Sequence, residues 1–161
     1  MRIYLASPVF SQFERRWNRE IAEGIRRSVP GARVILPQDF KISKKYNDRR
    51  HFGTLFKRCV EGIDRCDVLV AVLDGPDCDS GTSFEVGYAY ALGKPIIGLR
   101  TDFRKSQEKG VNIMLSRACT YFIPDPSFRE DSDLVVKDIA GRLKQIRERL
   151  SDRPGSAAAD A

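Results

Sequence analysis

Hydrophobic and polar positions alternate along this chain in two distinct periods. Short, continuous apolar runs predict buried strands at residues 2–6, 32–36, 68–73, 96–99 and 120–123. Between them, apolar residues recur every three or four positions and predict helices at residues 11–29, 52–65, 82–92 and 131–150. Pro and Gly at the junctions, such as Pro30-Gly31, end one element before the next begins.

Two of these helices carry an apolar stripe that should face a core. In the first helix the expected core residues are Phe13, Trp17, Ile21 and Ile25. In the last helix they are Leu134, Val135, Ile139, Leu143 and Ile146. Strands that alternate with such helices predict an α/β fold: an open parallel sheet of about five strands, flavodoxin-like and doubly wound, with helices on both faces.

The length of 161 residues predicts one domain, which we place at residues 1–150. Residues 151–161 are rich in Ala, Gly and Asp and have nothing to bury, so we expect a disordered tail there. Residues 38–50 are polar and lack a period. Because such a connection is long for a compact domain, we expect a functional loop or lid.

The predicted strand–loop–helix–strand unit at residues 67–99 is the chemically richest stretch. Ligands of parallel sheets bind beyond the carboxyl ends of the strands, and four acids follow this strand: Asp74, Asp77, Asp79 and Glu85. One interpretation makes the aspartates turn residues and Glu85 the partner of Thr82 in a capping box. The other places Glu85 among buried groups of an apolar helix, where a carboxylate is costly unless it is bonded or used.

The composition of the chain argues against several classes of protein. Apolar residues make up 42% and charged residues 31% of the chain, and no apolar run approaches the roughly 20 residues of a membrane span, so we expect a cytoplasmic protein without a membrane partner. The net charge of +6 arises in clusters on predicted helix faces without interleaved aromatics, so nucleic-acid binding is not expected. Four cysteines without a CxxC pair and a single His51 predict reduced thiols, no metal and no cofactor.

The motif Asp79-x-Gly81-Thr82-x-x-Glu85-x-Gly87-x-Ala89, followed by Gly93-Lys94, resembles the nucleoside 2-deoxyribosyltransferases. The likeness extends to residues 3–6, 37–38 and 112–114, and covers roughly residues 1–125 in the same order. It implies an enzyme that takes a 2′-deoxynucleoside and a free nucleobase and exchanges the base. The implied route is a covalent deoxyribosyl-glutamate intermediate with retention of configuration.

The resemblance implies roles for three catalytic residues. Glu85 matches the nucleophile, and its place near a helix start should keep it ionised. Tyr4 matches a tyrosine that hydrogen-bonds and orients that carboxylate, and Asp79 matches an aspartate that binds sugar hydroxyls or moves a proton to the base. Without the resemblance, Tyr4 is equally well a core aromatic and Asp79 the start of an Asx turn.

The resemblance also implies binding residues. Gln38 would contact the base edge, Phe10 would stack on the base, and Gly81 belongs to the substrate-binding motif. Asn112 and Met114 match a segment that completes a neighbouring subunit's pocket, which implies a homodimer or larger homo-oligomer. On their own, the last two are a loop amide and a core methionine.

One position departs from the family pattern, and two other functions stay open. Cys59 stands where many relatives carry an acid, so the assisting acid is in doubt. With the same Glu85, a nucleoside or deoxynucleoside-monophosphate N-glycosidase would pass the sugar to water; the glycine-free loop at residues 7–11 favours unphosphorylated substrates. A non-enzymatic nucleotide-sensing module is compatible with the same fold. The preference for purines or pyrimidines is not determined.

Overall fold

Five parallel strands form a single sheet in the computed structural model, which describes residues 1–41, 49–104, 110–125 and 132–152. The strand order is β2-β1-β3-β4-β5. Their bounds are Arg2–Ala6 for β1, Arg33–Ile35 for β2, Val68–Val72 for β3, Ile96–Arg100 for β4 and Tyr121–Pro124 for β5. The predicted open parallel sheet is therefore confirmed, and β1 and β3 lie side by side at its centre.

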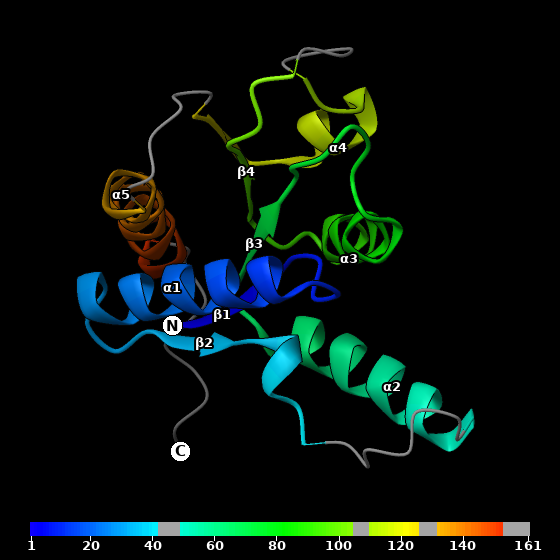
Figure 1. Ribbon diagram of the computed structural model, residues 1–161. Helices are drawn as coiled ribbons and strands as arrows, with labels where there is room; N and C mark the ends of the chain where they lie inside the picture. The colour runs from blue at the N-terminus through cyan, green and yellow to red at the C-terminus, as the bar shows by residue number, and fades with distance from the viewer. Residues whose placement is uncertain (42–48, 105–109, 126–131, 153–161) are drawn as a thin grey trace, which may run out of the picture.

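Helices cover both faces of the sheet (Figure 1). The helices α1 (Gln12–Ser28) and α5 (Asp133–Ser151) lie on one face. On the other face lie α2 (Arg49–Arg65), α3 (Ser80–Ala91) and α4 (Ile113–Ala118), and a short 3-10 helix, η1 (Pro37–Asp39), follows β2. This doubly wound arrangement follows from right-handed crossovers on either side of β1 and β3.

Each face of the sheet has its own core. One core joins alternate β1 and β3 residues to α1 and α5, and includes Ile3, Val70, Ile21 and Ile139. The other joins the intervening strand residues to α2 and α3, and includes Tyr4, Leu69, Ile63 and Val86. Strand side chains alternate between faces, so Tyr4 points toward the α2 and α3 side.

Two predicted core residues are instead exposed. Phe13 is 86% exposed and Leu134 is 40% exposed. A spacing of four residues turns about 40° further than a full helical turn, so three such steps back from Ile25 carry Phe13 about 120° away from the sheet. By the same rotation, Leu134 lies about 150° from the middle of the buried face of α5. The remaining predicted core residues of α5 are buried.

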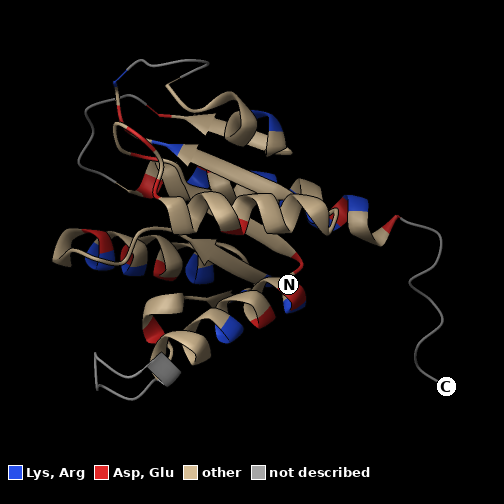
Figure 2. Cartoon of the chain, turned by 90° about the vertical axis from the view of Figure 1, so that its right-hand side faces the viewer, with Lys and Arg blue, Asp and Glu red and all other residues tan. Residues whose placement is uncertain are grey.

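Charged residues occur along the helices, whereas the strands contain few of them (Figure 2). Lys and Arg alternate with Asp and Glu on these helices rather than forming a block of one sign in this view. No helix in the described ranges is long and apolar enough to cross a membrane. The predicted lid falls largely on residues 42–48, and the predicted tail largely on residues 153–161, which lie outside the described residues.

Candidate active site

A tyrosine and a glutamate that are 81 positions apart in the sequence meet on the face of the sheet that α2 and α3 cover. The Tyr4 hydroxyl donates a hydrogen bond to Oε1 of Glu85, with 2.5 Å between the oxygens. Tyr4 lies on β1 and is fully buried, whereas Glu85 projects from α3 and keeps partial exposure. This is the contact that the resemblance predicts.

Asp79 caps α3, and Glu85 takes no part in the cap. Oδ2 of Asp79 accepts hydrogen bonds from the backbone N–H of Thr82 at 2.8 Å and from its hydroxyl at 3.1 Å. The helix therefore begins at Ser80, and Glu85 falls in the second turn. The interpretation of Glu85 as the partner of Thr82 in a capping box is wrong. A capping box does occur at the start of α1, between Ser11 and Glu14.

The environment of Glu85 opposes its ionisation. Burial raises the pKa of Glu85 to about 7, the nearby charge of Asp79 adds to the rise, and hydrogen bonds from Tyr4 and Cys59 oppose it. The expectation that the helix dipole keeps this carboxylate fully charged does not hold, because desolvation outweighs the donors. Burial and the Glu85 charge raise the pKa of Tyr4 far above its ordinary value, so Tyr4 remains a donor.

Helix α2 supplies a third group to this site because it packs closely on β1. A Cβ at Gly62 would lie 2.8 Å from Cε2 of Tyr4, a distance that would force the ring to move. Cys59 lies one helical turn earlier on the same side of α2 and packs, partly buried, against the core that contains Tyr4. Burial raises the pKa of the Cys59 thiol, so it is neutral at physiological pH.

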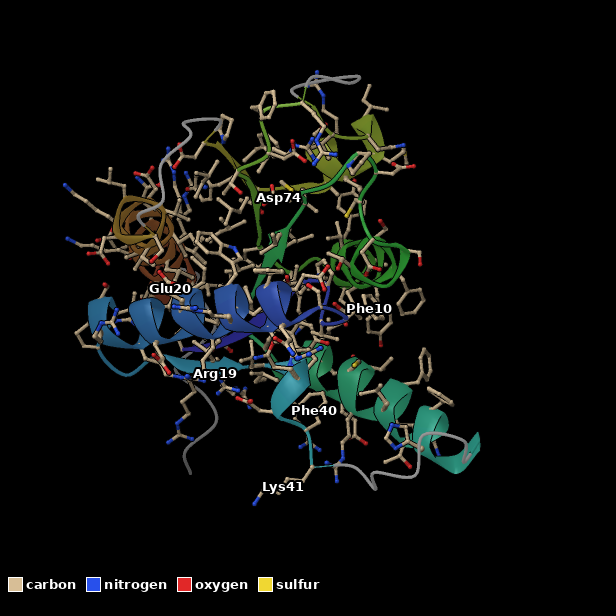
Figure 3. All side chains as sticks on the ribbon, viewed as in Figure 1. Phe10, Arg19, Glu20, Phe40, Lys41 and Asp74 are labelled. Atoms are coloured by element: carbon tan, nitrogen blue, oxygen red, sulfur yellow. The ribbon has the colours of Figure 1, made fainter. Side chains whose placement is uncertain are left out.

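Phe10 lies at the tip of the loop between β1 and α1, on the side of the molecule where α3 lies, and is 73% exposed (Figure 3). Buried Asn18 braces this loop: its amide accepts from the Ser7 hydroxyl at 2.7 Å and donates to the carbonyl of Pro8 at 2.9 Å. Sequence reasoning missed Asn18, although an asparagine within the apolar stripe of a helix is a usable signal. The hydrogen bonds of Asn18 thus hold in place the loop that carries Phe10.

The side chain of Gln38 is hydrogen-bonded to residues of α1 and is not free to contact a nucleobase. Its Nε2 donates to the carbonyl of Arg15 at 2.9 Å, and its Oε1 accepts from Nδ2 of Asn18 at 3.3 Å. Both halves of the side-chain amide are therefore occupied in this structure. A base contact would require Gln38 to exchange one of these bonds.

Asn112 and Met114 lie at the start of α4, away from Glu85. Asn112 caps α4 by accepting a hydrogen bond from the N–H of Met114 at 2.9 Å, and Met114 is 77% exposed. Both line a cavity of about 530 Å³ together with Ser83, Val86, Gly87 and Tyr90 of α3. Of these, Ser83, Gly87 and Tyr90 project about 140–160° away from Glu85 around the axis of α3. The structure therefore does not bring Asn112 and Met114 together with Glu85 of the same chain.

The remaining motif residues hold the loops in place. Gly81 leaves room for the cap, because a Cβ there would lie 3.1 Å from Oδ2 of Asp79. Asp74, at the end of β3 (Figure 3), accepts hydrogen bonds from the backbone N–H of Thr101 at 2.6 Å and from its hydroxyl at 2.5 Å. Asp74 therefore ties the loop after β3 to the loop after β4, and Asp77 is exposed beside the cavity.

Sequence reasoning missed the buried Arg100 at the end of β4. Its Nη1 donates to the carbonyls of Leu73 at 2.7 Å and Gly75 at 2.8 Å, and its Nη2 lies 3.8 Å from Oδ2 of Asp102. An arginine directly after an apolar strand was the available signal. Within the described parts of the chain, no three His, Cys, Asp or Glu side chains come together as a metal site.

Comparisons with known proteins identify relatives of this chain. A nucleoside deoxyribosyltransferase of Limosilactobacillus fermentum is 26% identical over 140 residues, which cover 79% of this chain and 81% of that protein. An uncharacterized Schizosaccharomyces pombe protein is 37% identical over 91 residues, covering 54% of this chain; the match spans about a third of that protein's length, at 35%.

A solved 2-deoxyribosyltransferase from Bacillus psychrosaccharolyticus shares the fold. Its TM-score is 0.68 at 23% identity, with 87% of this chain and 90% of that chain covered. A family model described as nucleoside 2-deoxyribosyltransferase matches residues 3–114, more than half of the sequence. The chain therefore belongs to the nucleoside 2-deoxyribosyltransferase family, whose members are enzymes that act on nucleosides.

Proposed function

We propose that this protein is a nucleoside 2-deoxyribosyltransferase with Glu85 as its nucleophile. The observation that carries the proposal is the 2.5 Å hydrogen bond from Tyr4 to Oε1 of Glu85. That bond orients a partly exposed carboxylate on α3, the helix that follows the central strand β3. In parallel sheets this region is where ligands bind.

The reaction proceeds by two displacements at the sugar. An Oε atom of Glu85 bonds to C1′ as the bond from C1′ to the base nitrogen breaks, and the electron pair leaves with the base, which takes up a proton. A nitrogen of the incoming base then attacks C1′ and releases Glu85. Two inversions at C1′ amount to retention of configuration.

Tyr4 and Asp79 support these steps. Tyr4 keeps its proton, because burial and the Glu85 charge raise its pKa, so it stays a hydrogen-bond donor to the carboxylate throughout. Asp79 has Oδ2 committed to Thr82, and we assign its Oδ1 to sugar hydroxyls or to proton transfer with the base. Because Cys59 supplies no second carboxyl, we assign the role of the acid to Asp79 among the described residues.

The loop between β1 and α1 favours unphosphorylated nucleosides. Oε2 of Glu14 accepts the backbone N–H of Ser11 at 2.6 Å, so a carboxylate already occupies the start of α1, where a phosphate would otherwise be attracted. The Arg15 guanidinium donates to the carbonyls of Val9 and Phe10, both at 2.8 Å. These contacts leave a 5′-phosphate with few donors in this loop.

A homo-oligomer is part of the proposal. Asn112 and exposed Met114 lie on the other side of α3 from Glu85, so they would serve the pocket of a second subunit rather than their own. Size-exclusion chromatography with light scattering would measure the assembly. A monomer at the concentrations used in the assay would contradict this part of the proposal.

Incubation with deoxyinosine and adenine tests the activity. Deoxyadenosine is the expected product, hypoxanthine with free sugar would indicate the N-glycosidase, and ligand binding without any turnover would indicate a sensing module. With deoxynucleoside alone, mass spectrometry should detect one deoxyribosyl group on the peptide that contains Glu85. Glu85→Ala should lose at least about 10³-fold in activity, since it removes the group that attacks C1′. Undiminished turnover in Glu85→Ala would refute the mechanism.

A further inference from the structure

The buried side chain of Asn18 joins two segments that follow neighbouring strands. Asn18 lies on α1 and is 1% exposed. It is bound to the loop after β1, because its Oδ1 accepts from the Ser7 hydroxyl at 2.7 Å and its Nδ2 donates to the carbonyl of Pro8 at 2.9 Å. The same Nδ2 donates at 3.3 Å to Oε1 of Gln38, in η1 after β2. Both segments follow the carboxyl ends of parallel strands, where ligands of such sheets bind.

These contacts determine which way the side-chain amide of Asn18 points. An amide oxygen only accepts hydrogen bonds, and an amide nitrogen only donates them. The nitrogen of Asn18 faces two oxygens, the carbonyl of Pro8 and Oε1 of Gln38. A half-turn of the amide would place its oxygen against both of them inside the protein, which is costly because buried polar groups need partners. Asn18 is therefore held in one orientation.

The orientation of Asn18 in turn determines that of the Gln38 amide. Nε2 of Gln38 donates to the carbonyl of Arg15 at 2.9 Å, and its Oε1 accepts from Asn18. A reversed Gln38 amide would bring two donors together at Asn18 and two acceptors together at Arg15. When a ligand displaces one of these two bonds, the other still keeps the donor and the acceptor of Gln38 on the same sides.

We propose that Asn18 is a positioning residue that makes the site discriminate between amino and oxo nucleobases through Gln38. This inference rests on the proposed function, with Gln38 as a contact of the base. Adenine presents an amino donor beside a ring-nitrogen acceptor, whereas hypoxanthine presents a carbonyl acceptor beside an N–H donor at the same two positions. An amide held in one orientation pairs with one of these edges, and an amide that turns freely pairs with either.

The first test compares adenine and hypoxanthine as acceptors of the sugar of deoxyguanosine. The native protein should differ at least about tenfold in kcat/KM between the two bases, and Asn18→Ala should bring the two values within about threefold of each other. Cytosine and uracil carry the same amino and oxo difference and form a second pair. A native protein that accepts both members of each pair equally would overturn the inference. So would an Asn18→Ala protein that is slower with both bases but keeps their ratio, because a purely structural role predicts that result.

The second test measures the Gln38 amide directly. Its ¹⁵N relaxation, assigned by the absence of the signal in Gln38→Leu, should show a rigid side chain in the native protein and a mobile one in Asn18→Ala. This measurement needs no turnover, so it separates a failure of this inference from a failure of the proposed function. In a protein without turnover, the ratio of the dissociation constants of the two bases replaces the ratio of kcat/KM. A Gln38 amide that is equally rigid in both proteins would overturn the inference.

A matched control is available at another link between α1 and η1. Nη2 of Arg19 lies 3.1 Å from Oδ1 of Asp39, but the Arg19 side chain is 53% exposed, and Arg19→Gln should leave the base ratio and the Gln38 amide unchanged. If Asn18→Ala does not fold, Ser7→Ala decides. It removes the donor to Oδ1 of Asn18 and should reduce the base ratio by about twofold or more. An unchanged ratio with an unchanged Gln38 amide in Ser7→Ala would then contradict the proposal.

Discussion

Two carboxylates near the loops that follow β3 and β4 have pKa values that are shifted in opposite directions. The Asp102 side chain is 7% exposed, and burial alone would raise its pKa, but hydrogen bonds from Arg104 and Gly75 and the charge of Arg100 lower it instead. Burial raises the pKa of Glu85 to about 7, because only neutral donors oppose it and Asp79 repels it. The surroundings of Asp102 therefore stabilise its anionic form, whereas those of Glu85 stabilise its anionic form only weakly.

This difference separates a structural site from a reactive one. Asp102 has a cation and backbone N–H groups as partners, so its charge is satisfied and it holds the loops together. Glu85 retains a poorly stabilised negative charge, which a sugar carbon with oxocarbenium character would relieve. Perturbed carboxylates of this kind concentrate at functional sites. The comparison favours Glu85, and not Asp102, as the group that reacts.

The largest effect on folding is expected when Asp102 loses its buried partner. Arg100→Met should lower the free energy of unfolding by about 3–5 kcal/mol, because it removes the buried donor to the carbonyls of Leu73 and Gly75 and leaves Asp102 with the exposed Arg104 as its cation. Urea denaturation at pH 7 measures this. Arg104→Ala is the control: its side chain is 54% exposed, so the loss should be about 1 kcal/mol or less. Equal losses of unfolding free energy in the two variants would show that the buried Arg100 contributes no more to stability than the exposed Arg104.

A gain in stability is expected when the charge of Glu85 is removed. The folded-state pKa of about 7 exceeds the ordinary value of 4.5, so the folded protein binds the Glu85 proton more tightly, and the stability gained from that proton is lost as the pH rises through 7. At pH 8, Glu85→Gln should be more stable than the native protein by up to about 3 kcal/mol. At pH 4, the difference should nearly disappear. Urea denaturation at both pH values checks it, and a constant difference would contradict the assigned pKa.

The smallest of these effects is expected for the hydroxyl of Tyr4. Tyr4→Phe keeps the ring that packs on Gly62 and removes the donor to Glu85, so the acidic limb of kcat/KM should move up by about one pH unit. Tyr88→Phe is a suitable control, because the Tyr88 hydroxyl binds Asp64 on the surface at 2.8 Å and not Glu85. An unchanged profile in Tyr4→Phe would show that the hydrogen bond to Glu85 is not used in catalysis.

Much of the fold could be predicted because its signals are local. The apolar run at residues 68–73 marks β3 within one residue, and α1, α2, α3 and α5 lie where the period of three to four residues places them, whereas α4 was not predicted from it. Errors arose where a local pattern was extended too far. Phe13 and Leu134 fit a spacing rule but rotate away from the sheet, so the helical period, and not the apolar character of a side chain, determines what is buried.

Less of the candidate site could be predicted. Glu85, Tyr4 and Asp79 were selected through a motif, but Asp79 also caps α3, and Gln38 and Asn18 bind each other across the loop after β1. Arg100 and Asp74 join two loops that are far apart in the sequence. Such roles depend on which side chains become neighbours, and residue type and spacing do not reveal this.

By itself, the sequence determined the order of strands and helices, the parallel α/β class and the acidic residues after the central strand, because these depend on periodicity and turn chemistry within a few residues. The tertiary structure decided that Tyr4 hydrogen-bonds to Glu85, that Asp102 is paired with arginines, and that Asn112 and Met114 lie away from their own chain's Glu85. The reason is that burial and electrostatic neighbours arise only when β1, α2 and α3 pack together. The same carboxyl group is an inert ion-pair partner or a candidate nucleophile according to that packing.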